Sequence, residues 1–248
     1  MIIKQIIQSL LILIKNKFSQ LSQDKIVDLL FTYFPIKIIK FLYNPCAGYL
    51  TCYSPKPGDI AIDIGAWRGN FSIVLSRMVG PQGLVIAIEP QAITCDKLKK
   101  RLNRLCIKNV KVLNCACYSS DTTKNYLVGN QADFSIIWQE ELKNNYFKDV
   151  EMITLKKLDT IIDELELEKV DYIKMDIEGA EVDALLGASG IIDFHKPHFA
   201  IASYHYVDGR RTNYQVEQIL RNYGYEAETI NTAHLTTCGS KRLSLTPS

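Results

Sequence analysis

Short apolar runs alternate with amphipathic stretches along most of the chain. The apolar runs predict strands at residues 60–64, 84–88, 110–115, 170–175 and 199–204, and a terminal strand pair at 225–230 and 234–237. The amphipathic stretches predict helices at residues 69–79, 91–105, 180–186 and 212–222. Repeated strand–helix units imply a mostly parallel sheet with helices on both faces. Residues 118–150 are less regular, and an excursion of that length is typical of a lid or a substrate wall.

The N-terminal part of the chain follows a different pattern. Residues 1–45 read as helical and are expected to end near Asn44-Pro45. Residues 1–14 are rich in Ile and Leu but too short for a spanning helix, which needs about 20 apolar residues. An amphipathic helix is expected there, packed on the domain, on a second subunit in a homodimer, or on a membrane surface. The domains are therefore predicted as an N-terminal helical extension at 1–50 and an α/β domain at 51–248.

Composition narrows the class of protein. The 248 residues suit one α/β domain with an extension, and 47% apolar residues suffice for a large core. The formal net charge of +2, with no block of like charges, argues against nucleic acid as a partner. Seven cysteines with no C-x-x-C pair predict reduced, mostly buried thiols in a cytoplasmic enzyme.

A glycine turn between the first strand and its helix is the most informative motif. Asp63 ends the strand, Gly65-Ala66-Trp67-Arg68-Gly69 forms the turn, and Asn70 opens the helix. Such a turn brings backbone N–H groups and a helix N-terminus close to a nucleotide-like ligand. Glu89, at the end of the second strand, is placed to accept hydrogen bonds from ribose hydroxyls. Together these features predict an adenosine-containing cofactor.

The turn favours S-adenosylmethionine over a dinucleotide. A dinucleotide turn needs G-x-G-x-x-G, and Trp67 stands where the second glycine would allow a pyrophosphate to approach. No Walker lysine pattern is present either. Asp63 suits the ammonium of the methionine moiety, and carboxylates at both ends of the site suit a sulfonium cation. The alternative is a Rossmann-like domain whose cofactor site is not used.

A second motif places three acids between the fourth strand and the next helix. Asp176, Glu178 and Glu181 lie in Lys174-Met175-Asp176-Ile177-Glu178-Gly179-Ala180-Glu181. Helix capping explains one of these acids more easily than three. His205 follows the fifth strand. Since carboxyl ends of parallel strands share one edge, these residues are expected on the same rim as Asp63 and Glu89.

With these motifs the chain resembles the FkbM family of methyltransferases over residues 55–238. The resemblance rests on Pro57-Gly58-Asp59, Asp63-Ile64-Gly65-Ala66 with Gly69, Glu89-Pro90, Leu155 to Thr160, Lys174 to Glu181, and Phe199 to His205. It implies a seven-stranded, mostly parallel Rossmann-like sheet, the class I methyltransferase fold, that uses S-adenosyl-L-methionine. Residue by residue, it implies a cofactor site of Asp63, Gly65, Ala66, Gly69, Asn70, Glu89, Ala116 and Cys117. The acceptor side would comprise Asp176, Glu178, Glu181, Tyr204 and His205.

The resemblance implies transfer to an oxygen of a sugar, glycolipid or other small metabolite. We expect Asp176 or Glu178 to act as general base on the acceptor hydroxyl, with His205 as the alternative base. His205 is equally open to a packed, hydrogen-bonded role, and a metal-ligand role is the least favoured. No metal ligand is assigned, although Asp176 and Glu178 could hold Mg²⁺. Other possible functions are transfer to nitrogen or to a lipid-linked acceptor, and a cofactor-binding module without catalysis.

Overall fold

A seven-stranded sheet forms the centre of the protein. The computed structural model describes residues 22–33, 47–128, 149–231 and 234–241. The strands of the sheet are β1 (Ile60–Ile64), β2 (Leu84–Ile88), β3 (Val110–Leu113), β7 (Tyr172–Met175), β8 (His198–Ala202), β11 (Tyr225–Asn231) and β12 (Leu235–Lys241). Their order is β11-β12-β8-β7-β1-β2-β3. β12 runs antiparallel to both neighbours, and the other pairs are parallel.

This arrangement is the class I methyltransferase fold predicted from the sequence. β1 lies between β2 and β7, so the strand order reverses on either side of it. In open α/β sheets, ligands bind outside the carboxyl ends of the strands at such a reversal. The predicted strands and helices of the α/β domain are confirmed, with ends that shift by at most four residues.

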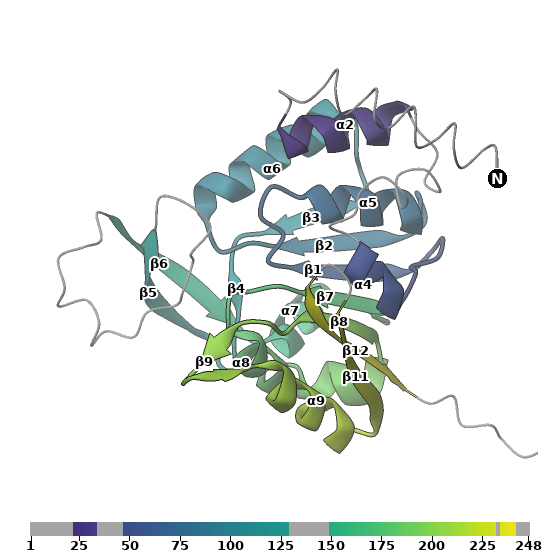
Figure 1. Ribbon diagram of the computed structural model, residues 1–248. Helices are drawn as coiled ribbons and strands as arrows, with labels where there is room; N and C mark the ends of the chain where they lie inside the picture. Colours follow the sequence, from purple (N-terminus) through teal and green to yellow (C-terminus); the bar gives the residue numbers. More distant parts are fainter. Residues whose placement is uncertain (1–21, 34–46, 129–148, 232–233, 242–248) are drawn as a thin grey trace, which may run out of the picture.

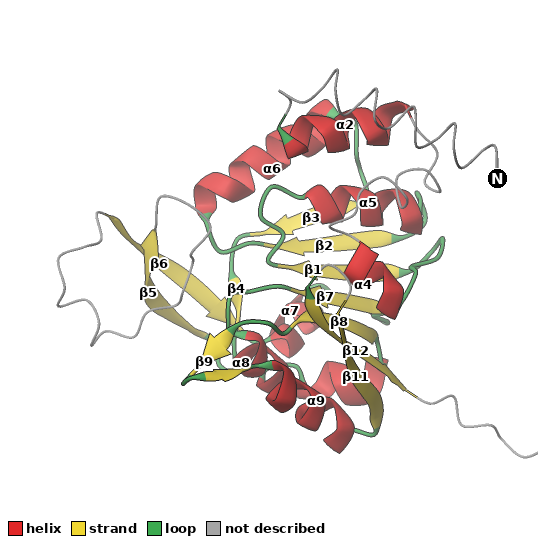
Figure 2. Ribbon diagram, viewed as in Figure 1, coloured by secondary structure: helices red, strands yellow, loops and turns green. Residues whose placement is uncertain are grey.

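Helices cover both faces of the sheet (Figures 1 and 2). One face carries α2 (Gln23–Tyr33), α4 (Ala47–Cys52), α5 (Asn70–Val79) and α6 (Ala92–Arg104). The opposite face carries α7 (Leu158–Glu164), α8 (Glu181–Leu186), the π-helical turn η3 (Ile191–His195) and α9 (Asn213–Asn222). Because both faces are covered, the strands read as nearly continuous apolar runs.

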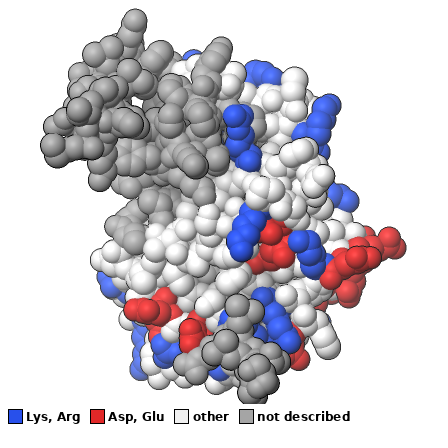
Figure 3. Space-filling model, turned by 90° about the vertical axis from the view of Figure 1, so that its right-hand side faces the viewer, with Lys and Arg blue, Asp and Glu red and all other residues white. Residues whose placement is uncertain are grey.

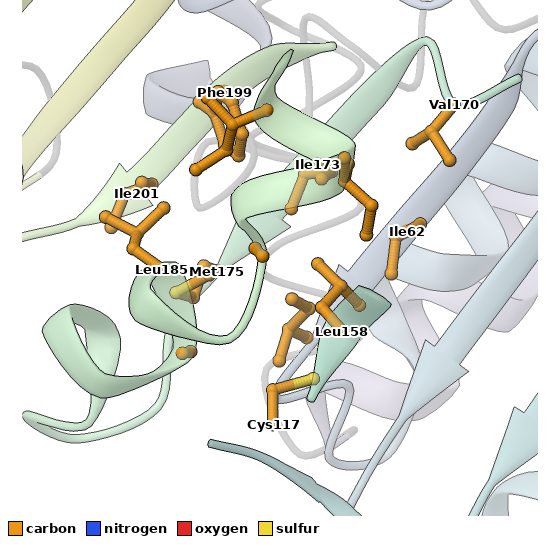
Figure 4. Packing of buried hydrophobic residues seen from close by; sticks show 14 of the residues in the cluster. Ile62, Cys117, Leu158, Val170, Ile173, Met175, Leu185, Phe199 and Ile201 are labelled. Atoms are coloured by element: carbon orange, nitrogen blue, oxygen red, sulfur yellow. The ribbon is translucent and has the colours of Figure 1, made fainter. Parts of the chain in front are cut away.

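Alternation along β1 divides its side chains between the two faces. Ile62 and Ile64 pack with α7 and α8, whereas Ala61 belongs to the cluster beneath α5. Figure 4 shows Ile62 near Leu158, with Ile173 and Met175 of the neighbouring strand in the same cluster. The two layers hold the carboxyl ends of β1 and β7 rigidly side by side.

Part of the irregular stretch is a small second sheet. β4 (Ala116–Cys117), β5 (Thr122–Val128) and β6 (Asp149–Lys156) form it in the order β4-β6-β5, and β5 pairs antiparallel with β6. The hairpin extends from the edge where β1, β2 and β3 end (Figure 1). Trp138, Tyr146 and Phe147, aromatic residues of this stretch that could stack on a sugar or equally belong to the core, lie outside the described residues. A shorter hairpin joins β9 (Tyr206–Val207) to β10 (Arg210–Arg211).

Helix α2 is fastened to the sheet domain by a buried guanidinium. Arg101 Nε of α6 lies 2.6 Å from Asp28 Oδ1, and its Nη2 donates to the Asp24 carbonyl at 2.9 Å. Its Nη1 donates to Asn70 Oδ1 at 2.7 Å. At least this part of the N-terminal extension therefore packs on the domain, and the predicted boundary at residues 50/51 stays a prediction.

The other predictions for the extension fall outside the described residues. These are the amphipathic helix at 1–14 and the helix end near Asn44-Pro45. Among the helices that the structure describes, none combines the length and the apolar character that crossing a bilayer requires.

The prediction that the cysteines are reduced is wrong at two positions. Cys52 of α4 and Cys238 of β12 form a disulfide, with their Cα atoms 5.0 Å apart. They are 186 residues apart in sequence, so no local spacing indicates the pair. Cys95, Cys115 and Cys117 are free and buried as expected, Cys106 is free but exposed, and Cys46 lies outside the described residues.

Replacing Cys52 by serine is expected to lower the free energy of unfolding by about 2–5 kcal/mol, because the bond closes a long loop in the unfolded chain. Urea unfolding without reductant measures this loss, and Cys106→Ser is the control for losing a free thiol. Equal stability of the two variants would contradict a bond that forms in solution.

Candidate active site

The glycine turn is shaped by close backbone packing. The N–H groups of Gly65 and Ala66 both donate to the Ile88 carbonyl, at 3.0 Å each. Gly65 has φ +76°, and a Cβ there would lie 2.0 Å from the carbonyl oxygen of Asp176. Only glycine allows this approach. The turn after β1 is thereby pressed against the residue that follows β7.

Asp63 lies beneath the turn in a fully buried ion pair. Lys174 Nζ of β7 is 3.0 Å from Asp63 Oδ1, and the Ser72 hydroxyl donates to Oδ2 at 2.6 Å. Lys174 Nζ also donates to the Gly65 carbonyl at 3.0 Å. The Asp63 carboxylate therefore holds Lys174, and Lys174 holds the backbone of the turn.

Glu89 joins the turn to the end of β2. Its Oε2 accepts from the Trp67 N–H at 2.9 Å, and its Oε1 accepts from the Gln91 N–H at 3.0 Å. Burial raises the pKa of the Glu89 carboxyl, although these two N–H groups act in the opposite direction. The carboxylate is held in one orientation at the cavity wall.

A cavity opens between the turn, the acidic motif and the small sheet. Its lining comprises Ile64, Gly65, Trp67, Ile88, Glu89, Pro90, Cys115, Ala116, Cys117, Ile153, Asp176, Ile177, Glu178 and Ala180. Apolar side chains of Ile88, Cys117 and Ile153 suit the faces of an adenine ring. The carboxylates of Glu89, Asp176 and Glu178 suit hydroxyl and cationic groups. These residues fit S-adenosylmethionine, which carries all of these chemical groups.

Asp176 stands at the inner end of the acidic motif. The Tyr49 hydroxyl of α4 donates to Asp176 Oδ2 at 2.9 Å, and the Tyr204 hydroxyl lies 3.5 Å from Oδ1. Burial, together with the Asp176 carboxylate, raises the pKa of both tyrosines, which therefore stay protonated as donors. Two tyrosines from distant parts of the chain orient this one carboxylate.

Glu181 is fully buried and lies behind the rim instead of facing the cavity. Its Oε1 accepts from the N–H groups of Ile177 and Gly179, at 3.3 and 3.2 Å. These bonds stabilise a loop in which Glu178 has φ +56°. Of the three acids, Glu181 thus has a structural role, although it holds the preceding loop and does not cap α8.

His205 connects the three acids. Its Nδ1 lies 2.8 Å from Glu181 Oε1, and its Nε2 lies 3.2 Å from Glu178 Oε2 and 3.7 Å from Asp176 Oδ1. Burial opposes protonation of the ring, but the nearby carboxylates of Glu178 and Glu181 outweigh it and raise the pKa of His205 to about 10. A histidine that already carries its proton at neutral pH is a poor general base.

The structure brings most of the predicted site residues to one rim. Gly65, Glu89, Ala116, Cys117, Asp176 and Glu178 line the cavity. Tyr204 and His205 lie against Asp176. The described cavity lining does not include Asp63, Ala66, Gly69, Asn70 or Glu181. Direct contact of these five residues with a ligand stays a prediction.

Sequence reasoning missed several residues of the site, among them Tyr49, Trp67, Ile153 and Lys174. A lysine among the apolar residues of β7 was a signal that Lys174 needs a buried partner. Nothing local marked Tyr49, because its partner Asp176 is 127 residues away in the sequence.

Comparisons with known proteins agree with this geometry. The family model described as the methyltransferase FkbM domain matches residues 63–227. Methyltransferase 1 of Beauveria bassiana is 25% identical over 155 residues, which cover 55% of this chain and 62% of that protein. Methyltransferase sdnD of Sordaria araneosa is 26% identical over 155 residues, which cover 51% of this chain and 59% of that protein. The chain thus spans about three fifths of these relatives.

Solved structures share the fold. The FkbM methyltransferase of Methylobacillus flagellatus superposes with a TM-score of 0.54 at 20% identity, covering 86% of this chain and 57% of that chain. Aeropyrum pernix fibrillarin, solved with bound S-adenosyl-L-methionine, superposes with a TM-score of 0.51 at 13% identity, covering 79% of this chain and 74% of that chain. Given the family match, the fold and the cavity, this chain belongs to the FkbM family of S-adenosylmethionine-dependent methyltransferases.

Proposed function

We propose that the protein methylates a hydroxyl group of a sugar, a glycolipid or another small metabolite. The observation that carries this proposal is that Asp176 and Glu178 border the same cavity as Gly65 and Glu89. A proton acceptor for the substrate therefore lies beside the predicted cofactor residues. A neutral hydroxyl needs such an acceptor when its oxygen forms a bond to carbon.

Each part of the cavity has a defined task in this proposal. The cofactor supplies an electrophilic methyl group on a sulfonium, and an oxygen lone pair that takes this methyl leaves a neutral thioether. Glu89 and the turn at Gly65 form the end of the cavity that takes the cofactor. Asp176 or Glu178 takes the hydroxyl proton, so the carboxylate becomes a neutral carboxyl group. Alignment of the two reactants contributes much of the rate.

The proposed base is a carboxylate and not His205. Both ring nitrogens of His205 lie near carboxylates, which keep the ring protonated. Tyr49 occupies Oδ2 of Asp176, whereas Oδ1 has only longer contacts, 3.5 Å to the Tyr204 hydroxyl and 3.7 Å to His205 Nε2. This orientation favours Asp176 or Glu178 as the group that meets the acceptor.

The proposal concerns small acceptors and does not include nucleic acid, since the formal net charge is only +2 and the sequence has no block of like charges. Figure 3 shows the side of the molecule away from the small sheet, where the basic and acidic side chains of the described residues are interspersed. A phosphate backbone is usually met by a continuous basic surface. A homodimer, and contact with a membrane through residues 1–17, remain part of the proposal. The membrane contact would bring the protein close to a lipid-linked acceptor.

Methyl transfer from labelled cofactor to panels of glycans, glycolipids and hydroxylated metabolites, read by mass spectrometry, tests the function. Asp176→Asn is expected to lower kcat by about 10²–10⁴-fold, because a positioned proton acceptor contributes about that much. Cofactor affinity, measured by calorimetry, should change little. The control is Asp193→Asn, which removes a mostly exposed carboxylate of η3.

Finding the labelled methyl group on a nitrogen atom of the acceptor, and not on an oxygen atom, would contradict the choice of acceptor atom. Tight cofactor binding with no transfer to any acceptor would contradict catalysis and favour a binding module.

A further inference from the structure

We propose that Asp176, Glu178 and His205 bind a divalent first-row transition-metal ion on the acceptor side of the cavity. One ligand atom from each of these residues lies within 4.8 Å of the other two. The inference rests on the proposed function in one respect: Asp176 and Glu178, the residues proposed to activate the acceptor hydroxyl, would do so through a bound ion. The ion site itself is argued from geometry that is independent of the substrate.

The spacing of the three ligand atoms suits a single ion. Ligands about 2.1 Å from a metal are about 3.0 Å apart at a right angle and about 3.4 Å apart at a tetrahedral angle. His205 Nε2 lies 3.2 Å from Glu178 Oε2 and 3.7 Å from Asp176 Oδ1. Small side-chain adjustments bring all three atoms to bonding distance from one point.

His205 supplies evidence beyond a cluster of acids. Its imidazole is only 8% exposed, and Nε2 makes no well-formed hydrogen bond although two carboxylates lie near it. Nε2 faces two carboxylate oxygens at once, which is the position of a ligand that shares a metal with them. A metal ion at this point would displace the Nε2 proton to solvent, since a ligating imidazole nitrogen carries no proton.

Glu181 completes the arrangement on the far side of the ring. Metal-bound histidines usually donate their second N–H to a carboxylate, which fixes the ring and strengthens the ligand. Glu181 Oε1 lies 2.8 Å from His205 Nδ1. Glu181 is itself held by the N–H groups of Ile177 and Gly179. It is therefore a positioning residue for His205.

Charge also favours a cation at this position. Three carboxylates surround one imidazole, and Lys174 of the neighbouring strand β7 is paired with Asp63. A divalent ion would neutralise this excess and remain open to a substrate oxygen, since the three residues fill only part of a coordination sphere. Imidazole together with carboxylates suits Mn²⁺ or Zn²⁺ better than Mg²⁺, which prefers oxygen ligands.

An ion here would change how the acceptor is activated. A hydroxyl bound to the metal loses its proton more readily, and the proton passes to solvent water. With the ion bound, this route takes the place of the direct proton transfer to Asp176 or Glu178 described under the proposed function. Methyl transfer would consequently depend on the metal, whereas direct proton transfer to a carboxylate would not.

Titration of the full chain with MnCl₂ after treatment with EDTA tests the inference, with calorimetry and the electron paramagnetic resonance of free Mn²⁺ as readouts. We expect one ion per chain, and binding weakened about 10–100-fold in Glu181→Gln, as for other residues that orient a ligand. His205→Ala should abolish binding at this site. His195→Ala and Asp193→Asn are matched controls, since both lie on η3 away from the cavity.

The outcomes separate this inference from the proposed function. Absence of Mn²⁺ binding, or equal binding by His205→Ala and His195→Ala, overturns the metal site even if methyl transfer occurs. Binding that is lost in His205→Ala supports the site even if no acceptor is found. Circular dichroism and cofactor affinity verify that each variant folds. If His205→Ala does not fold, Asp176→Asn provides a second variant that removes a ligand of the ion.

Discussion

Replacing Lys174 by methionine is expected to lower the free energy of unfolding by about 3–5 kcal/mol, because it leaves a buried carboxylate without its cationic partner. Asp63 is fully buried, and the Lys174 side chain is 6% exposed. The change also removes the hydrogen bonds from Nζ to the carbonyls of Ile64 and Gly65. The glycine turn should loosen, so cofactor affinity should fall as well.

Urea unfolding gives the stability, and calorimetry gives the cofactor affinity. Lys156→Met is the matched control, since Lys156 pairs with Glu164 at the surface, where such pairs contribute about 0–1 kcal/mol. Adding Asp63→Asn to Lys174→Met should recover part of the lost stability, because no unpaired charge then remains buried. A Lys174→Met variant as stable as Lys156→Met would mean that the buried pair does not hold this region together.

Gly65→Ala is expected to reduce methyl transfer at least about a hundredfold, because displacing positioning elements by an ångström costs about that much. An added Cβ would lie 2.0 Å from the Asp176 carbonyl oxygen, so β1 and β7 must move apart at the cavity. Asp176 would move with its backbone. Both the cofactor end and the acceptor end of the cavity should therefore be disturbed.

The control for this variant is Gly58→Ala. Gly58 also has positive φ, +89°, but an added Cβ there meets nothing within 4 Å. Both variants place an alanine in the left-handed backbone region, which costs about 1 kcal/mol, but only Gly65→Ala adds a clash with a neighbouring strand end. If Gly65→Ala behaves like Gly58→Ala in cofactor binding and turnover, the close packing of the turn is unimportant for the site.

The sequence was most informative where function depends on local geometry. The strand, turn and helix around Gly65 follow from neighbouring residues, and so does the loop that carries Asp176 and Glu178. The rule that parallel strands share a carboxyl edge was enough to place these residues on one rim with Glu89. The family resemblance, the cofactor and the fold follow from the same segments and are confirmed.

Contacts between distant segments were beyond the reach of the sequence. The Cys52–Cys238 disulfide and the bond from Tyr49 to Asp176 join parts of the chain separated by 186 and 127 residues. Neither contact leaves a periodic or local signal, since each depends on how α4 packs on the far strands of the sheet. The same applies to Ile153, which enters the cavity only because β6 pairs beside β4.

By itself, the amino-acid sequence determined the elements, their order and the chemical character of the rim, because these depend on residue spacing and strand direction. Only the tertiary structure decided the partner of each charged group. It buried Asp63 against Lys174, turned Glu181 toward His205 and left Asp176 and Glu178 at the cavity. The physical reason is that burial and ion pairing depend on distances across the fold, and those distances are set by packing of the whole chain.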